Sequence, residues 1–186
     1  YYDIHYPMNN RAGSNSIGKN TTIILLHSGG WNGGDKGVDA KQLVASLVTQ
    51  GYVVFDIQYR LLSSNFINTS ADFGFDLGWF DPNPTEFNNL RGNFSIGDMV
   101  YDFGEFTKHL ANLTVEDRYG ANLDSVVIMG VSAGGHIAAI ATYGYKHPFF
   151  AGNFSSSLTI KAAVFFNPPN DAEYFFHDGH PMYYPY

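Results

Sequence analysis

The sequence predicts an α/β domain with a mostly parallel sheet and helices on both faces. Short apolar runs alternate with segments whose apolar residues recur at helical spacing, which is the pattern of strands connected by helices. Two runs, residues 23–26 and 126–129, are continuously apolar, as expected for strands buried on both faces. With 45% hydrophobic and 17% aromatic residues, the 186-residue chain can bury a substantial core, which argues against disorder.

Five strands and three helices are expected along the chain. The strands are expected at residues 1–6, 22–27, 52–58, 125–129 and 160–166. A helix ended by Gly51 has an apolar face made of Leu43, Val44, Leu47 and Val48. A second, with Asp98 interpreted as its structural cap, is marked by Met99, Phe103, Phe106 and Leu110. The third is rich in alanine and is expected at about residues 133–145.

The composition excludes several partners and chemistries. The 10 basic and 17 acidic residues give a net charge of −7, whereas proteins that bind nucleic acids or anionic membranes recruit basic residues. Because the chain has no cysteine, thiol catalysis, disulfides and cysteine-ligated metals are excluded. No apolar stretch approaches the roughly 18 residues of a membrane-spanning helix. We expect no metal and no cofactor.

Residues 62–97 interrupt the alternation of strands and helices. The segment is rich in Asn, Phe, Gly and Ser and contains the turn signal Asp81-Pro82-Asn83-Pro84. Structureless stretches of this length are typical of lids, binding loops or disordered insertions, and the many aromatic residues argue against disorder. We interpret the segment as an ordered insertion that covers a site or binds a protein partner, with a merely decorative loop as an equal alternative.

The clearest chemical signal is a nucleophile elbow. Residues 130–134, Gly-Val-Ser-Ala-Gly, match G-x-S-x-G between a predicted strand and the alanine-rich helix. Such a sharp turn needs its flanking glycines, and it projects the serine hydroxyl from the carboxyl edge of the sheet, beside a helix N-terminus. Ser132 is therefore the candidate nucleophile.

A glycine-rich loop follows the strand at residues 22–27. The sequence His27-Ser28-Gly29-Gly30-Trp31 can turn backbone N–H groups toward a substrate carbonyl, as an oxyanion hole requires. The candidate donors are the amides of Gly29, Gly30 and Ala133. The alternative is a strand-to-helix turn without chemistry.

Together these motifs resemble the α/β-hydrolase fold. The resemblance is carried by residues 27–36, by Asp56-Ile57-Gln58-Tyr59-Arg60-Leu61 and by residues 130–136. It is closest to the esterase/lipase branch that includes BD-FAE-type feruloyl-esterase-like proteins, hormone-sensitive-lipase-like enzymes and kynurenine formamidases. The resemblance implies a carboxylesterase or lipase-like serine hydrolase that acts on a small-molecule ester. Two positions depart from the family pattern: Ser28 replaces a loop glycine, and Gln58 replaces an acidic residue.

The catalytic acid and histidine are not expected within the chain. In this fold they follow the serine in the order acid, then histidine, at the ends of later strands, and too few residues follow Ser132 for both strands. His136 is expected to pack beside the elbow, and His147 lies beyond the helix. His177 and His180, with Asp171 and Asp178, have the right order but a compressed spacing; metal binding at 177–180 is a weaker alternative to a plain loop. Residues 1–186 are therefore expected to form one partial domain, incomplete at the C-terminus.

Two functions remain open from the sequence. The first is hydrolysis of a carboxylic ester through an acyl-enzyme on Ser132, with base and acid outside the chain. The second is a non-catalytic glycoprotein that uses the scaffold for structure or protein interaction. An apolar acyl pocket is conjectured between Trp31, residues 62–97 and residues 165–169.

Five N-glycosylation sequons favour a secreted or lumenal protein. The acceptors are Asn20, Asn68, Asn93, Asn112 and Asn153, whereas chance predicts about 1.9 from the Asn, Ser and Thr content. All five fall in predicted loops or element ends, where a glycan can be tolerated. Accidental sequons in an Asn-rich chain are the alternative.

Overall fold

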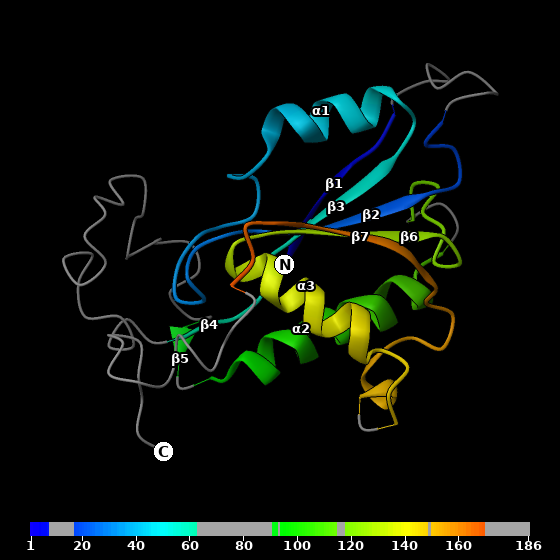
Figure 1. Ribbon diagram of the computed structural model, residues 1–186. Coiled ribbons are helices and arrows are strands. Elements are labelled where there is room, and N and C mark those ends of the chain that lie inside the picture. Colours follow the sequence, from blue (N-terminus) through cyan, green and yellow to red (C-terminus); the bar gives the residue numbers. More distant parts are fainter. Residues whose placement is uncertain (8–16, 63–90, 93, 115–117, 149, 170–186) are drawn as a thin grey trace.

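The computed structural model describes residues 1–7, 17–62, 91–92, 94–114, 118–148 and 150–169. Within them, five strands form one sheet in the order β1-β3-β2-β6-β7 (Figure 1). Their bounds are β1 (Tyr2–His5), β2 (Thr22–Leu26), β3 (Val53–Ile57), β6 (Val126–Val131) and β7 (Ile160–Phe166). β1 is antiparallel to β3 and the other neighbours are parallel. The mostly parallel sheet is therefore confirmed.

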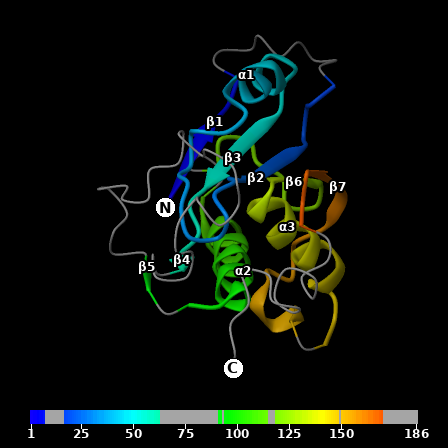
Figure 2. The same ribbon diagram turned by 60° about the vertical axis from the view of Figure 1, so that its left-hand side comes forward.

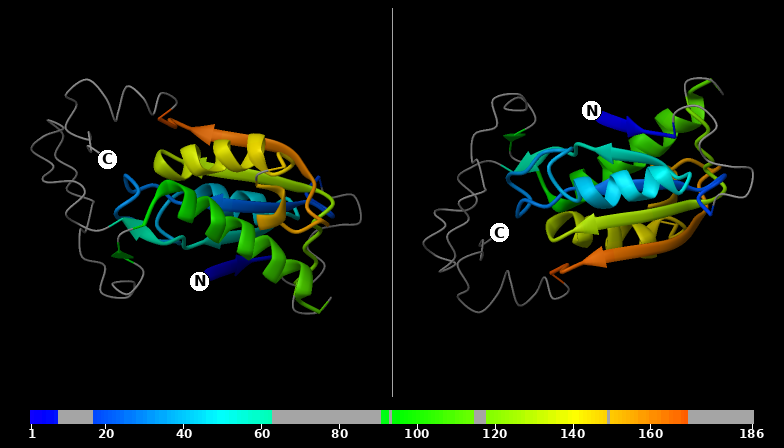
Figure 3. Two further views of the ribbon diagram at one scale, coloured as in Figure 1. Left: turned by 90° about the horizontal axis from the view of Figure 1, so that it is seen from below. Right: turned by 90° about the horizontal axis from the view of Figure 1, so that it is seen from above.

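Helices cover both faces of the sheet, as predicted. α1 (Lys41–Thr49) lies on one face, and α2 (Ile96–Asn112) and α3 (Ala133–Gly144) lie side by side on the other (Figure 3). The turned view in Figure 2 shows the same separation of α1 from α2 and α3. A short 3-10 helix, η4 (Ala151–Asn153), follows α3 and leads toward β7.

The continuously apolar run of β2 supplies both sides of the core, because successive strand residues point to opposite faces. Ile23 and Leu25 pack in the smaller cluster with Val44 of α1. Ile24 and Leu26 belong to the larger cluster, which includes the buried residues of α2 and α3. All five residues of β2 are buried, so β2 is the central strand of the described sheet.

α2 begins inside the segment that was predicted to be one insertion. Its four predicted apolar residues, Met99, Phe103, Phe106 and Leu110, are all buried. Its start is fixed by a capping box, in which the Ser95 hydroxyl accepts from the Asp98 N–H at 3.2 Å and the Asp98 carboxylate accepts from the Ser95 N–H at 2.7 Å. Asp98 is thus a structural capping residue, as predicted, with Ser95 as the N-cap itself.

The two ends of the insertion lie next to each other. β4 (Leu61–Leu62) pairs in parallel with β5 (Arg91–Gly92), so the described residues on either side of 63–90 lie side by side. Residues 63–90, which include Asn68 and most of the predicted partner surface, lie outside the described residues. The interpretation of this insertion as a lid or partner surface stays a prediction.

Candidate active site

Ser132 lies at the turn between β6 and α3, and its backbone is in an unusual conformation. Its φ is 49° and its ψ is −116°, in the region of positive φ that residues other than glycine rarely occupy. Its N–H donates to the Phe166 carbonyl of the neighbouring strand at 2.8 Å, and its carbonyl accepts from the His136 N–H at 3.0 Å. β6 runs two residues further than predicted, to Val131, and so delivers the chain directly into this turn.

The glycines of the elbow are required by close backbone approach. A Cβ at Gly130 would collide with the Gly134 carbonyl, across the turn. A Cβ at Gly134 would collide with the Leu26 and His27 carbonyls at the end of β2. The elbow is therefore packed directly against the strand from which the glycine-rich loop emerges.

The loop after β2 curls back on itself. Gly29 has φ 128° and Gly30 has φ 57°, and the Gly29 carbonyl accepts from the Gly33 N–H at 2.9 Å. Within the part of the chain that the structure describes, the amides of Gly29, Gly30 and Ala133 donate no hydrogen bond. The three predicted donors thus follow the carboxyl ends of β2 and β6, which are parallel neighbours in the sheet.

Trp31 of the glycine-rich loop contacts His136 of α3. Their rings meet edge to face with centroids 5.7 Å apart. Trp31 is buried, and the acyl pocket conjectured from the sequence stays a prediction, because residues 63–90 lie outside the described residues. Burial lowers the pKa of His136, which keeps its ring neutral, and the ring makes no hydrogen bond to Ser132 among the described residues. His136 therefore packs beside the elbow, as expected.

Four side chains hold the glycine-rich loop in place. Asp39 accepts from the Ser28 N–H at 2.5 Å and Asp56 from the Gly37 N–H at 2.7 Å. The Tyr59 hydroxyl donates to the His27 carbonyl at 2.8 Å, and the rings of Tyr59 and His27 stack with centroids 4.2 Å apart. The fourth is Gln58.

Gln58 explains one departure from the family pattern. Its Oε1 accepts from the Lys36 N–H at 3.1 Å, and its Nε2 donates to the Tyr59 carbonyl at 2.9 Å. An ionised carboxylate could make only the first of these bonds, because it has no donor. Gln58 is therefore adapted to this position as a loop anchor.

Two buried titratable groups sit below the loop. Burial raises the pKa of Asp56 to about 6, with the hydrogen bond from Gly37 acting in the opposite direction. Burial lowers the pKa of His27 to about 4, and its Nδ1 bonds the Ser28 carbonyl at 2.5 Å. His27 is neutral and enclosed, so we assign it to the support of the loop rather than to proton transfer.

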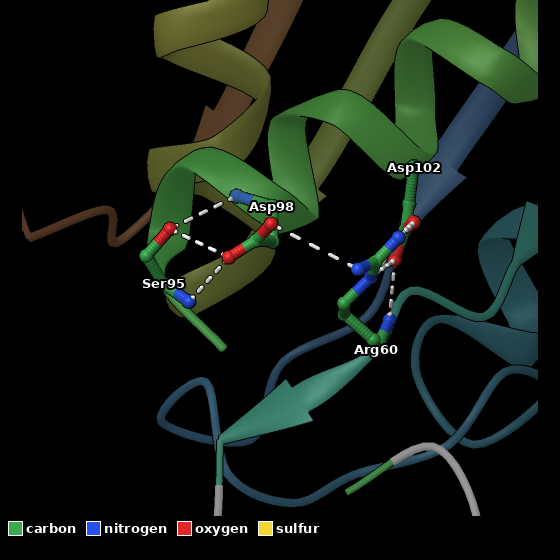
Figure 4. A network of polar contacts seen from close by, with 4 residues as sticks. All are labelled: Arg60, Ser95, Asp98 and Asp102. Atoms are coloured by element: carbon green, nitrogen blue, oxygen red, sulfur yellow. Dashed lines mark hydrogen bonds and ion pairs between the residues drawn. The ribbon is translucent and has the colours of Figure 1, made fainter. Parts of the chain in front are cut away.

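Arg60 joins the chain leaving β3 to α2 (Figure 4). Its Nε donates to both carboxylate oxygens of Asp102, at 2.9 and 2.8 Å, and its backbone N–H donates to the same group at 2.9 Å. A second, longer contact of 3.8 Å joins Nη1 to Asp98. Hydrogen bonding to Asp102 raises the pKa of Arg60 above its usual value. The Tyr59-Arg60 pair thus has a structural role at this site.

The described residues do not complete a catalytic triad. No described histidine bonds the Ser132 side chain, and His177, His180, Asp171 and Asp178 lie outside the described residues. No group of three His, Asp or Glu side chains that could hold a metal occurs among the described residues. None of the described helices is both long enough and apolar enough to cross a membrane.

Comparisons with known proteins support the fold. Residues 3–89 match the family model of BD-FAE. Esterase B from Lactobacillus rhamnosis (HN001) has a TM-score of 0.61 at 20% identity, over 97% of this chain and 48% of that one. Thermogutta terrifontis esterase 2, in a structure phosphorylated by paraoxon, has a TM-score of 0.56 at 20% identity, over 90% of this chain and 51% of that one. A sequence search of curated proteins finds no match.

The fold and the elbow define a protein of the α/β-hydrolase fold. The chain spans about half the length of the solved structures it matches, which are about 20% identical to it. The match to the BD-FAE family model covers residues 3–89, just under half of the chain. The resemblance inferred from the sequence motifs is thereby confirmed.

Proposed function

We propose that this chain forms the nucleophile-bearing part of a serine hydrolase that cleaves carboxylic esters. The observation that carries the proposal is the backbone of Ser132, held at φ 49° between β6 and the N-terminus of α3. Sparsely populated backbone conformations cost on the order of 1–3 kcal/mol and cluster at active sites, which supports a catalytic role for Ser132.

The reaction follows from these groups. The Ser132 Oγ attacks the ester carbonyl carbon, and its proton passes to a general base. The negative charge that develops on the carbonyl oxygen is stabilised by the amides of Gly29, Gly30 and Ala133 and by the N-terminus of α3. The carbon–oxygen bond to the alcohol then breaks, the alcohol leaves with a proton, and water hydrolyses the acyl-enzyme. We expect the base and its orienting carboxylate to come from outside the described residues.

The neighbours supply probes for the test. One structure of Thermogutta terrifontis esterase 2 is phosphorylated by paraoxon, and another, with a TM-score of 0.55 at 19% identity, is butyrate-bound. We therefore propose that Ser132 reacts with organophosphorus reagents and that short acyl esters are substrates.

Labelling of the natural full-length protein with a fluorophosphonate probe tests the proposal. We expect a labelled peptide that contains Ser132 and hydrolysis of p-nitrophenyl butyrate. Ser132→Ala should abolish both, whereas Ser46→Ala, on the exposed surface of α1, should change neither. A folded full-length protein that leaves Ser132 unlabelled while a control serine hydrolase reacts would favour the non-catalytic scaffold instead.

A further inference from the structure

Three of the five sequons fall on described residues, and their acceptor side chains differ in exposure. Asn20 and Asn112 are exposed, whereas Asn153 is half-buried. The side chains of Asn20 and Asn112 make no hydrogen bond among the described residues. Asn68 and Asn93 lie outside the described residues. The structure thus separates two exposed acceptors from one that is half-buried.

Asn20 lies at the end of the sheet opposite Ser132. It comes two residues before the first residue of β2, whereas Ser132 follows the last residue of β6. β2 and β6 are parallel and in register, with Thr22 beside Val126 and Leu26 beside Gly130. The six residues of β6 span about 16 Å. Asn20 and Ser132 lie beyond opposite ends of this span, so they are separated by more than the length of the strand.

Asn112 lies at the same end of the domain. It is the last residue of α2, which runs from the insertion back to the connection that enters β6 at its first residue. That connection is fixed to the segment before β2, because the Asn122 Nδ2 donates to the Asn20 carbonyl at 3.1 Å and the Asn122 N–H donates to the Thr22 hydroxyl at 2.7 Å. Both exposed acceptors therefore lie at the edge of the sheet where the parallel strands begin.

Asn153 is packed where η4 meets α2. A Cβ at Gly104 of α2 would collide with the Asn153 carbonyl and would lie 3.4 Å from the Asn153 Cβ. The next residue, Phe154, is buried against the ring of Phe103. Asn153 is therefore a less open acceptor than Asn20 and Asn112.

We infer that Asn20 and Asn112 are N-glycosylation acceptors and that the end of the domain opposite Ser132 carries the glycans. In the modification, the side-chain amide nitrogen bonds to the anomeric carbon of an oligosaccharide carried on a lipid diphosphate. The bond from that carbon to the diphosphate oxygen breaks, and the nitrogen loses one proton. This inference implies a secretory or lumenal protein, and it does not depend on the proposed esterase activity.

The structure also fixes when Asn20 can be modified. The hydroxyl of its sequon belongs to Thr22, which is fully buried and already accepts the hydrogen bond from Asn122 in the folded domain. An enzyme that reads this hydroxyl cannot reach it after folding. Modification of Asn20 must therefore precede the formation of β2.

The test uses the natural full-length protein, expressed in a eukaryotic secretory host. Treatment with peptide:N-glycosidase F should increase its gel mobility, and mass spectrometry should find Asn20 and Asn112 converted to aspartate. Asn20→Asp, which suits the φ of 66°, and Asn112→Asp should each remove one glycosidase-sensitive step. Thr114→Ala should also remove the Asn112 glycan, whereas Thr114→Ser, which keeps the sequon, should retain it.

The outcomes separate this inference from the proposed function. No glycosidase-sensitive step at either residue, or glycans found only at other asparagines, would overturn it. Fluorophosphonate labelling of Ser132 in the doubly substituted Asn20→Asp, Asn112→Asp protein should equal that of the unsubstituted protein, because both acceptors lie away from the elbow. Glycans at Asn20 and Asn112 without labelling at Ser132 would support the inference and refute only the proposed esterase.

Discussion

Replacing Gly134 by alanine tests whether the elbow is in direct backbone contact with the end of β2. Inside a helix, alanine is favoured over glycine by about 1 kcal/mol, so propensity alone predicts stabilisation. A Cβ at Gly134, however, would collide with the Leu26 and His27 carbonyls, which are backbone atoms of the central strand and cannot swing away. Forcing a carbon into such a site costs about 1–3 kcal/mol, and two backbone collisions place this case at or beyond the upper limit.

The expected net loss is therefore about 2 kcal/mol, or a fall in Tm of about 4–8 °C for a domain of this size. Thermal unfolding followed by circular dichroism measures it. Gly152→Ala is the matched control, because a Cβ there meets nothing within 4 Å. Gly134→Ala should also slow fluorophosphonate labelling, since Gly29 and Gly30 follow directly from the displaced strand. A Tm for Gly134→Ala equal to or above that of Gly152→Ala would refute the reasoning.

Two further predictions concern the groups below the glycine-rich loop. Tyr59→Phe leaves the buried His27 carbonyl without its 2.8 Å donor, so urea unfolding should show a loss of about 1–2 kcal/mol. Asp56, with its pKa raised from 3.8 to about 6, binds a proton more readily in the folded state, so its contribution to stability falls as the pH rises from about 4 to 6. In urea titrations, the free energy of unfolding of Asp56→Asn should therefore rise by up to about 3 kcal/mol relative to that of the unsubstituted protein as the pH goes from 4 to 7. A difference in unfolding free energy that does not change with pH would contradict this.

The strands and the elbow could be predicted from local signals. An uninterrupted apolar run such as 23–26 favours a strand that is covered on both faces of the sheet, and residues 23–26 lie in the central strand. The elbow requires glycines at fixed positions around Ser132, so residues adjacent in the sequence are enough to predict its geometry. The structure has β2 and the turn at Ser132 where these signals predict them, but Val127 and Met129 of the second apolar run are only half-buried, so β6 is not buried on both faces as β2 is.

The loop anchors could not be predicted in the same way. Asp39, Asp56 and Gln58 act on backbone groups of residues 28, 36 and 37, and the partner of each depends on how the loop curls. One signal was available in the sequence. Asp56 stands in the middle of a buried apolar strand, and a carboxyl group in such a place needs a hydrogen-bond donor. The pairing of β4 with β5 was also beyond prediction, because each strand has only two residues.

Backbone contacts maintain the strained conformation of Ser132, and none of them involves its side chain. The Ser132 N–H bonds Phe166, its carbonyl accepts from His136, and the glycine at 134 packs on the end of β2. Alanine at position 132 would meet the same backbone and carry a similar conformational cost, since serine and alanine both have a Cβ. Removal of the hydroxyl should therefore leave the unfolding free energy nearly unchanged while it abolishes labelling. That combination distinguishes loss of a nucleophile from loss of the fold.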